Sequence, residues 1–469
     1  MRRDYAVGFQ VGQDVEVEVG DVAQGGWCVA RPAGLPVVFV RHALPGERVI
    51  ARVTEVTTRF ARADAVYILA PSPDRVPAPC PNARPGGCGG CDWQHAALPA
   101  QRALKAAVIE QHLRRLAGVD RGVTVEPMPG DARGPLITAR SDTPGLGWRT
   151  RVQFAVRDDG VAGLRAHRSH EVIDIGDCLI AHPSIAELGI TRGRWRDAVA
   201  VEAVVGSTGP GGEPAERAVI ITPAGRGEPR RQRPGKQGRG GDGPVRSGER
   251  EQDRAASVPA DAVLSRAPGG LTPIRGRAYV WQHAAGRDWR VSAGAFWQVH
   301  PAAPDVLTAA VVAALEPKPG DGVLDLYCGA GLFAGAVAPA VGGDGTVIGI
   351  ESDPSAVRDA RRNLREWPWV RVHRGDVAGL LRRGGLPPAR LCVADPPRAG
   401  LVREVVDYLS GPGRAERFAY VSCDPATLAR DLAMLIERGW ALDGLRAFDA
   451  FPMTHHVECV ATLTRKRVP

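Results

Sequence analysis

The sequence predicts an α/β protein in which a small β-barrel and a central α+β domain precede an open, doubly wound sheet. From about residue 289 onward, short apolar stretches alternate with helical stretches, which is typical of a mostly parallel sheet. From Phe9 to about Leu69 the pattern is short, alternating and Val-rich, with Gly and Pro between the stretches, as in a small barrel. A chain of 469 residues is also too long for a single hydrophobic core. We therefore predict three units, at residues 1–70, 71–288 and 289–469.

The central unit contains a Cys-rich loop at residues 80–91 and strands such as 151–156. It also contains residues 223–258, which are rich in Gly and Arg and have no aromatic residue. Such a segment cannot bury enough apolar surface to fold by itself. We interpret it as a disordered linker, although a basic tract of this kind could also contact RNA.

The C-terminal unit is expected to be a Rossmann-like domain. Helices fit between most of its strands, for example at 354–366 and 425–438. The last two strands are separated by residues 452–456 only, too few for a parallel crossover, so the final strand should run antiparallel. The predicted strands are 322–326, 346–351, 370–373, 391–395, 418–423, 443–448 and 457–465.

The charge balance is basic. Lys and Arg total 60 against 52 Asp and Glu, which gives a net charge of +8 and a pI near 9.2. This suits a polyanionic partner without proving one. The sequence shows no signal peptide and no run of about 20 apolar residues. We expect a cytoplasmic monomer with no membrane contact.

A glycine-rich turn follows the first strand of the C-terminal unit, at residues 325–331. Missing side chains there let backbone amides approach a ligand closely. Glu351 ends the next strand, where a carboxylate can bind ribose hydroxyls. These features alone also fit a dinucleotide site, so an NAD-dependent oxidoreductase is an alternative.

Three further strand ends carry polar residues. Asp376, Asp395 and Cys423 follow the third, fourth and fifth strands of the predicted sheet. These positions fall on the carboxyl edge, where open α/β sheets bind ligands. Hydride transfer needs no thiol there, whereas a methyltransferase that modifies a weakly nucleophilic carbon does. The combination favours a methyltransferase.

Four cysteines form a second candidate site. Cys80, Cys88 and Cys91 have the spacing C-x7-C-x2-C, and Cys178 is the only other cysteine before residue 328 apart from Cys28. Spacing alone fits structural zinc and an iron–sulfur cluster equally well. Of the remaining cysteines, three are expected to be core residues: Cys328, Cys392 and Cys459.

At these motifs the sequence resembles the RNA uracil-C5 methyltransferase family over nearly the whole chain. The matching elements are Phe296-Trp297-Gln298, Asp325 to Gly331, Asp395-Pro396-Pro397-Arg398, Ser422-Cys423-Asp424-Pro425 and His455-His456-Val457-Glu458. Two positions depart from the family pattern. Leu332 and Asp424 each stand where members commonly have Asn.

The resemblance implies a class I methyltransferase domain that uses S-adenosylmethionine to methylate C5 of a uridine. It implies Cys423 as the nucleophile, which adds to C6, and Glu458 as the general base. Contacts to the methyl donor are implied for Gln298, Tyr327, Gly329, Glu351, Asp376 and Asp395.

The resemblance also implies a TRAM module, an RNA-binding barrel, at the N-terminus. It implies a [4Fe-4S] cluster on Cys80, Cys88, Cys91 and Cys178, with zinc as the alternative. Ribosomal RNA, specifically 23S rRNA, is the expected substrate because the TRAM module is more common in that branch; transfer RNA is the alternative. A non-catalytic RNA-binding protein is the rival from another class, and it is disfavoured because no catalytic element is missing.

Overall fold

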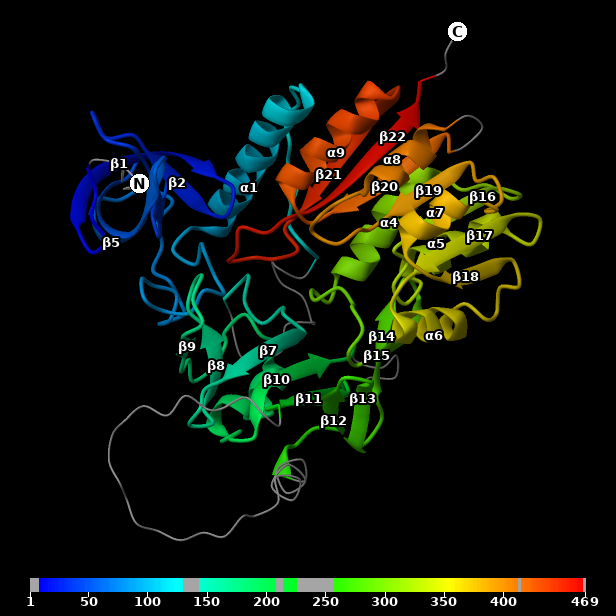
Figure 1. Cartoon of the computed structure of the whole chain (residues 1–469), viewed down its shortest axis with the longest axis horizontal. Helices are drawn as coiled ribbons and strands as arrows, with labels where there is room; N and C mark the ends of the chain where they lie inside the picture. The colour runs from blue at the N-terminus through cyan, green and yellow to red at the C-terminus, as the bar shows by residue number, and fades with distance from the viewer. Residues whose placement is uncertain (1–7, 130–142, 208–213, 226–256, 412–414, 467–469) are drawn as a thin grey trace, which may run out of the picture.

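The computed structural model describes residues 8–129, 143–207, 214–225, 257–411 and 415–466 (Figure 1). The predicted linker falls mostly at residues 226–256, outside the described residues. No helix in the described ranges is long and apolar enough to cross a membrane.

The N-terminal segment forms a closed five-stranded barrel, as predicted. Inward-facing side chains such as Val19, Val38 and Ala63 alternate with outward-facing ones and fill its interior. The barrel strands, in the order in which they close, are β1 (Asp14–Ala23), β2 (Trp27–Ala30), β3 (Val37–Arg41), β5 (Phe60–Ala70) and β4 (Arg48–Val56).

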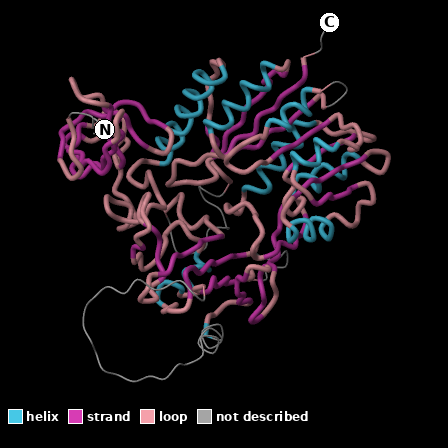
Figure 2. Tube along the Cα trace, in the orientation of Figure 1, coloured by secondary structure: helices cyan, strands magenta, loops and turns pink. Residues whose placement is uncertain are grey.

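The central part is built on a seven-stranded mixed sheet, which lies below the barrel and the C-terminal domain in Figure 2. Its core includes Phe154, Trp195 and Val201. In spatial order the strands are β13 (Gly270–Arg275), β12 (Ala262–Ala267), β11 (Arg217–Pro223), β10 (Ala198–Val205), β7 (Arg151–Val156), β8 (Ala162–Arg165) and β9 (Val172–Ile173).

The C-terminal domain contains the predicted doubly wound sheet. The final strand, β22, pairs antiparallel with β20, which confirms the prediction from the short connection. In spatial order the sheet consists of β18 (Val370–Arg374), β17 (Thr346–Glu351), β16 (Gly322–Leu326), β19 (Leu391–Ala394), β20 (Arg417–Ser422), β22 (Glu458–Arg465), β21 (Trp440–Phe448) and β6 (Val125–Glu126).

Helices cover both faces of this sheet (Figure 1). Successive strand residues point to opposite faces, so Val323 belongs to one core and Leu324 to the other. One face is covered by α4 (Ala303–Leu315), α5 (Leu332–Val341) and α6 (Pro354–Asn363), and the other by α1 (Leu98–His112), α7 (Val377–Arg383), α8 (Arg403–Ser410) and α9 (Pro425–Glu437).

Two elements from the segment 71–288 pack on the C-terminal domain. Helix α1 contacts α9, and β6 pairs with β21 as the last strand of its sheet. Lys105 on α1 is fully buried and forms an ion pair with Asp449 at the end of β21. These contacts fix the loop 449–457, which leads into β22. The domain boundaries at residues 70 and 288 remain predictions.

Candidate active site

The glycine-rich turn after β16 is shaped by its backbone. Tyr327 has a positive φ of 64°, and Gly331 has a φ of 95°. A Cβ on Gly331 would lie 2.8 Å from the Leu364 side chain, so glycine is required there. Asp325, fully buried below the turn, accepts a hydrogen bond of 2.7 Å from the Ala334 amide and ties the turn to α5. Burial raises the pKa of Asp325 to about 8.

Glu351 holds the turn from the neighbouring strand. Its Oε2 accepts a hydrogen bond of 3.0 Å from the Gly329 amide, and its Oε1 accepts from the amides of Ser352 and Asp353. The carboxylate therefore lies at the carboxyl edge, beside the glycine-rich turn. This is the position expected for a group that binds the ribose of the methyl donor.

Asp376 begins α7 and caps it, because its Oδ2 accepts a hydrogen bond of 2.8 Å from the Gly379 amide. Burial raises the pKa of the Tyr327 phenol to about 12, and the charge of Asp376 adds to this rise. Tyr327 therefore lies close enough to Asp376 to be influenced by its charge. Asp376 and Tyr327 are thus brought to the same edge as Glu351.

Gln298 and Asp395 meet on the other side of the turn. The Gln298 Nε2 lies 3.4 Å from the Asp395 Oδ2, at the outer limit of a hydrogen bond. Gln298 is buried, although it precedes α4 and lies 97 residues before its partner. The sheet therefore brings the predicted donor contacts together along one edge.

Cys423 lies between the end of β20 and the start of α9. Asp424 is the N-cap of that helix, and its Oδ1 accepts a hydrogen bond of 2.8 Å from the Thr427 amide. Burial raises the pKa of the Cys423 thiol to about 12, and the charges of Glu458 and Asp395 add to this. The nearby Arg398 guanidinium acts in the opposite direction and favours the thiolate.

Glu458 is the first residue of β22 and is 3% exposed. Among the residues that the structure describes, its Oε1 has no hydrogen-bond partner. Burial, reinforced by Asp395 and opposed by Arg398, raises the pKa of the Glu458 carboxyl well above its ordinary value. A buried carboxylate with a free oxygen beside a thiol is suited to proton transfer.

A series of side-chain contacts extends from Arg398, which influences both Cys423 and Glu458, to Asp92. The Arg398 Nη2 lies 3.2 Å from the His456 Nε2, and the His456 and His455 rings are 4.0 Å apart. Burial lowers the pKa of His456 to about 3, so its neutral ring accepts the hydrogen bond from Arg398. His455 Nδ1 in turn lies 2.6 Å from the Asp92 Oδ2. Asp92 lies in no sequence motif and could not be predicted as part of the site.

The four cysteines of the second candidate site lie around one small cavity, although Cys178 is distant in sequence. Burial raises the pKa of Cys88 and Cys91 and raises that of Cys178 to about 11. In the described part of the chain, however, no group of three or more His, Cys, Asp or Glu side chains is arranged to hold a metal ion. The cluster therefore stays a prediction. The three cysteines expected in the core are buried there: Cys328, Cys392 and Cys459.

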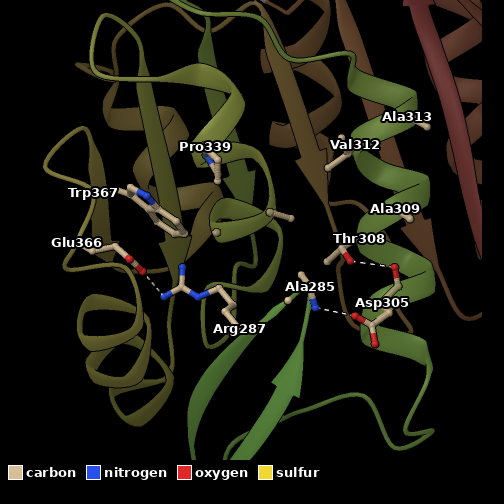
Figure 3. A pocket seen from close by; sticks show the side chains of 13 residues that line it. Ala285, Arg287, Asp305, Thr308, Ala309, Val312, Ala313, Pro339, Glu366 and Trp367 are labelled. Atoms are coloured by element: carbon tan, nitrogen blue, oxygen red, sulfur yellow. Dashed lines mark hydrogen bonds and ion pairs between the residues drawn. The ribbon is translucent and has the colours of Figure 1, made fainter. Parts of the chain in front are cut away.

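A larger cavity of about 720 Å³ lies between α4, α5 and the hairpin of β14 (Tyr279–Ala284) and β15 (Arg287–Ser292) (Figure 3). Arg287 in its wall pairs with Glu366 at 2.6 Å and lies over the Trp367 ring. None of the predicted site residues lines this cavity.

Three protein-family models match the chain. The TRAM domain model matches residues 8–66, which form the barrel. The models for Protein-L-isoaspartate(D-aspartate) O-methyltransferase and for tRNA (Uracil-5-)-methyltransferase match residues 291–379 and 389–466, respectively. The last two together cover most of the C-terminal domain.

Relatives match over the full chain. A protein of Streptomyces coelicolor named as an RNA methyltransferase is 50% identical over 97% of this chain and 93% of its own length. The 23S rRNA (uracil(1939)-C(5))-methyltransferase RlmD of Acidithiobacillus ferrooxidans is 31% identical over 97% of this chain and 98% of its own. The crystal structure of Pyrococcus abyssi tRNA (uracil-54, C5)-methyltransferase with S-adenosyl-L-homocysteine has the same fold, with a TM-score of 0.66, 22% identity, and coverage of 96% and 100%.

Together with the doubly wound sheet and the N-terminal TRAM barrel, the family models and the named relatives define an RNA methyltransferase, the class of enzyme that uses S-adenosylmethionine. The full-length similarity is more specific. The chain belongs to the RNA uracil-C5 methyltransferase family and is an RNA (uracil-5-)-methyltransferase. This conclusion removes the two alternatives from other classes, an NAD-dependent oxidoreductase and a non-catalytic RNA-binding protein.

Proposed function

We propose that the protein methylates C5 of a uridine in ribosomal RNA through a covalent adduct between Cys423 and C6 of the base. The observation that carries this proposal is the placement of a thiol and a buried carboxylate, Cys423 and Glu458, at the ends of adjacent strands. The charge of Glu458 contributes to the raised pKa of Cys423, which is consistent with a shared reaction site.

Carbon 5 of uracil is a poor nucleophile, and the adduct overcomes this. The Cys423 thiolate adds to C6, and the C5=C6 electron pair moves into the ring as an enolate. S-adenosylmethionine bound at the same edge would supply the methyl group that carbon 5 attacks, with S-adenosylhomocysteine as the leaving group. The charge of Arg398 opposes the rise in the pKa of Cys423 and so favours the thiolate needed for the first step.

Glu458 completes the cycle by accepting the proton from C5. The resulting electron pair restores the C5=C6 double bond, and the C6–S bond breaks to release Cys423. The free Oε1 of Glu458 is available to accept this proton. Donor contacts are assigned to the residues along the same edge: Gln298, Tyr327, Gly329, Glu351, Asp376 and Asp395.

The adduct can be tested with RNA that contains 5-fluorouridine, because fluorine cannot leave as a proton. The wild-type protein should form a species that resists denaturation. Cys423→Ala should form none, while it still binds S-adenosylmethionine by calorimetry. An equal adduct yield from Cys423→Ala would show that another residue attacks the base.

Ribosomal RNA is the favoured substrate because the full-length relative RlmD is named for 23S rRNA. Transfer RNA, the substrate named for the Pyrococcus abyssi protein, is the alternative. Mapping of 5-methyluridine in RNA from a strain that lacks the gene separates the two. Loss of the modification from transfer RNA alone would contradict the proposal that ribosomal RNA is the substrate.

We also propose that the four cysteines hold a [4Fe-4S] cluster, with zinc as the alternative. The protein is proposed to act in the cytoplasm. The support is that two distant segments bring four thiols to one cavity: Cys80, Cys88, Cys91 and Cys178. Four thiolates in a buried site would repel one another without a bound cation. We infer a role in structure or in RNA placement for this group, because methyl transfer needs no redox step.

A further inference from the structure

The barrel reaches into the active site through the turn between β1 and β2. The Nε2 of Gln24, in this turn, donates a hydrogen bond of 2.9 Å to the Oδ2 of Asp424, although the two residues are 400 positions apart. Asp424 directly follows Cys423. A module whose expected role is to bind RNA therefore contacts the residue next to the nucleophile.

Both carboxylate oxygens of Asp424 are engaged. Oδ1 accepts from the Thr427 amide at the start of α9, and Oδ2 accepts from Gln24. The Ser422 Oγ lies 3.3 Å from the Asp424 carbonyl oxygen, on the other side of Cys423. The segment that carries the thiol is thus fixed from the helix, from the strand and from the barrel.

The same turn packs tightly against the segment that leads to Glu458. A Cβ on Gly26 would lie 3.1 Å from the Asp92 Cβ and 3.2 Å from the His455 Cβ. The Gly26 carbonyl oxygen also accepts a hydrogen bond of 3.2 Å from the Trp93 Nε1. This leaves little room for the turn to shift without moving the loop 449–457.

Asp424 also departs from the Asn that is common in the family, and the contact explains why an acid fits here. The Gln24 Nε2 donates to a carboxylate oxygen of Asp424, which can only accept. An Asn that caps α9 through its oxygen would instead point its NH2 group at the Gln24 NH2 group. The Gln24 side chain would then have to turn over to restore a hydrogen bond.

We propose that Gln24 is a positioning residue for addition of the thiol to the base, and that it acts through Asp424 on Cys423. The barrel is then part of the active-site wall as well as a surface for RNA. This inference rests on the proposed function, because it takes Cys423 as the nucleophile. It predicts that a change in the barrel slows the chemical step without weakening RNA binding.

Gln24→Ala should lower kcat about tenfold, the loss expected when a hydrogen bond to a charged acceptor disappears. The KM for RNA and the melting temperature should stay close to those of the wild type. Gln10→Ala is the matched control, because Gln10 lies exposed on the same module. The rate of adduct formation with 5-fluorouridine RNA should fall in parallel with kcat in Gln24→Ala only.

A reciprocal exchange separates positioning from RNA binding. Gln24→Glu places two carboxylates together and should lower kcat more than Gln24→Ala does. Adding Asp424→Asn should recover most of the loss, because the Asn NH2 group can then donate to the new Glu. Recovery requires that the two side chains act as a pair.

Two results would overturn the inference. One is a rise in KM without a fall in kcat for Gln24→Ala, and the other is no recovery of kcat when Asp424→Asn is added to Gln24→Glu. If Gln24→Ala does not fold, the comparison of Gln24→Glu with the double variant that also carries Asp424→Asn still tests the inference. Failure of the proposed function gives a different pattern, in which Cys423→Ala keeps both activity and the adduct.

Discussion

Ser422 lies directly opposite Cys459 in the antiparallel register between β20 and β22. Cys423 directly follows Ser422, and Glu458 directly precedes Cys459. The pairing therefore places Cys423 and Glu458 at the same edge of the sheet. A parallel final strand would have put its first residue at the far edge. Side chains alternate along a strand, so Cys459 points into the core while Glu458 faces the site.

Glu458→Gln should transfer one methyl group per enzyme and then stall. Gln is close to isosteric with Glu and keeps a hydrogen-bonding group, but it cannot accept the C5 proton. The methylated adduct should therefore persist with ordinary RNA and appear as a protein–RNA species on a denaturing gel. The double variant with Cys423→Ala is the control and should give no such species.

Near wild-type turnover by a folded Glu458→Gln protein would show that Glu458 is not the base. His455 and His456 would then be the next candidates, with His455 favoured because the low pKa of His456, about 3, makes it a weak base.

Glu351→Gln should weaken S-adenosylmethionine binding about tenfold or more, because the donor ribose would lose a charged acceptor. The thermal stabilisation that the donor gives should shrink accordingly. Asp344→Asn, an exposed acid in the loop between α5 and β17, should bind the donor like the wild type. Equal binding by Glu351→Gln would remove Glu351 from the donor site.

Asp325 should make the protein less stable as the pH rises. An unfolded Asp has a pKa near 3.9, whereas burial raises that of Asp325 to about 8. Between these values the folded state keeps a proton that the unfolded state has lost. The free energy of unfolding should therefore fall by at most about 1.4 kcal/mol per pH unit, and the contribution becomes constant above about pH 8.

Asp325→Asn keeps an oxygen that can accept the Ala334 amide and carries no charge. Its free energy of unfolding, measured with urea from pH 5 to pH 8, should decline less steeply than that of the wild type. The other buried acids contribute to both proteins, so the difference isolates Asp325. Parallel curves would be inconsistent with a protonated Asp325 in the folded state.

Protein purified without oxygen should be brown and contain about four irons per chain if the cysteine site holds a [4Fe-4S] cluster. Cys178→Ser should lose most of this iron, whereas Cys28→Ser, at a buried cysteine in the barrel, should keep it. Stoichiometric zinc without iron would favour the alternative. Iron that is unaffected by Cys178→Ser would place the metal elsewhere.

The strand and helix pattern could be predicted from the sequence, because burial on one or both faces of an element imposes a periodicity on its apolar residues. The helix 425–438 and the final antiparallel strand are found as predicted. Site residues at strand ends could also be predicted from the sequence, because the carboxyl ends of parallel strands meet at one edge of the sheet. Cys423 and Asp395 are examples.

Contacts between segments far apart in the chain could not be predicted from the sequence and are seen only in the folded protein. Neither Gln24 nor Asp92 lies in a motif, and each gains its importance from a partner more than 350 residues away. The same holds for the placement of α1 and β6 on the C-terminal sheet. Such contacts depend on how domains dock, which follows from the shapes of complete surfaces and leaves no periodic signal in either segment.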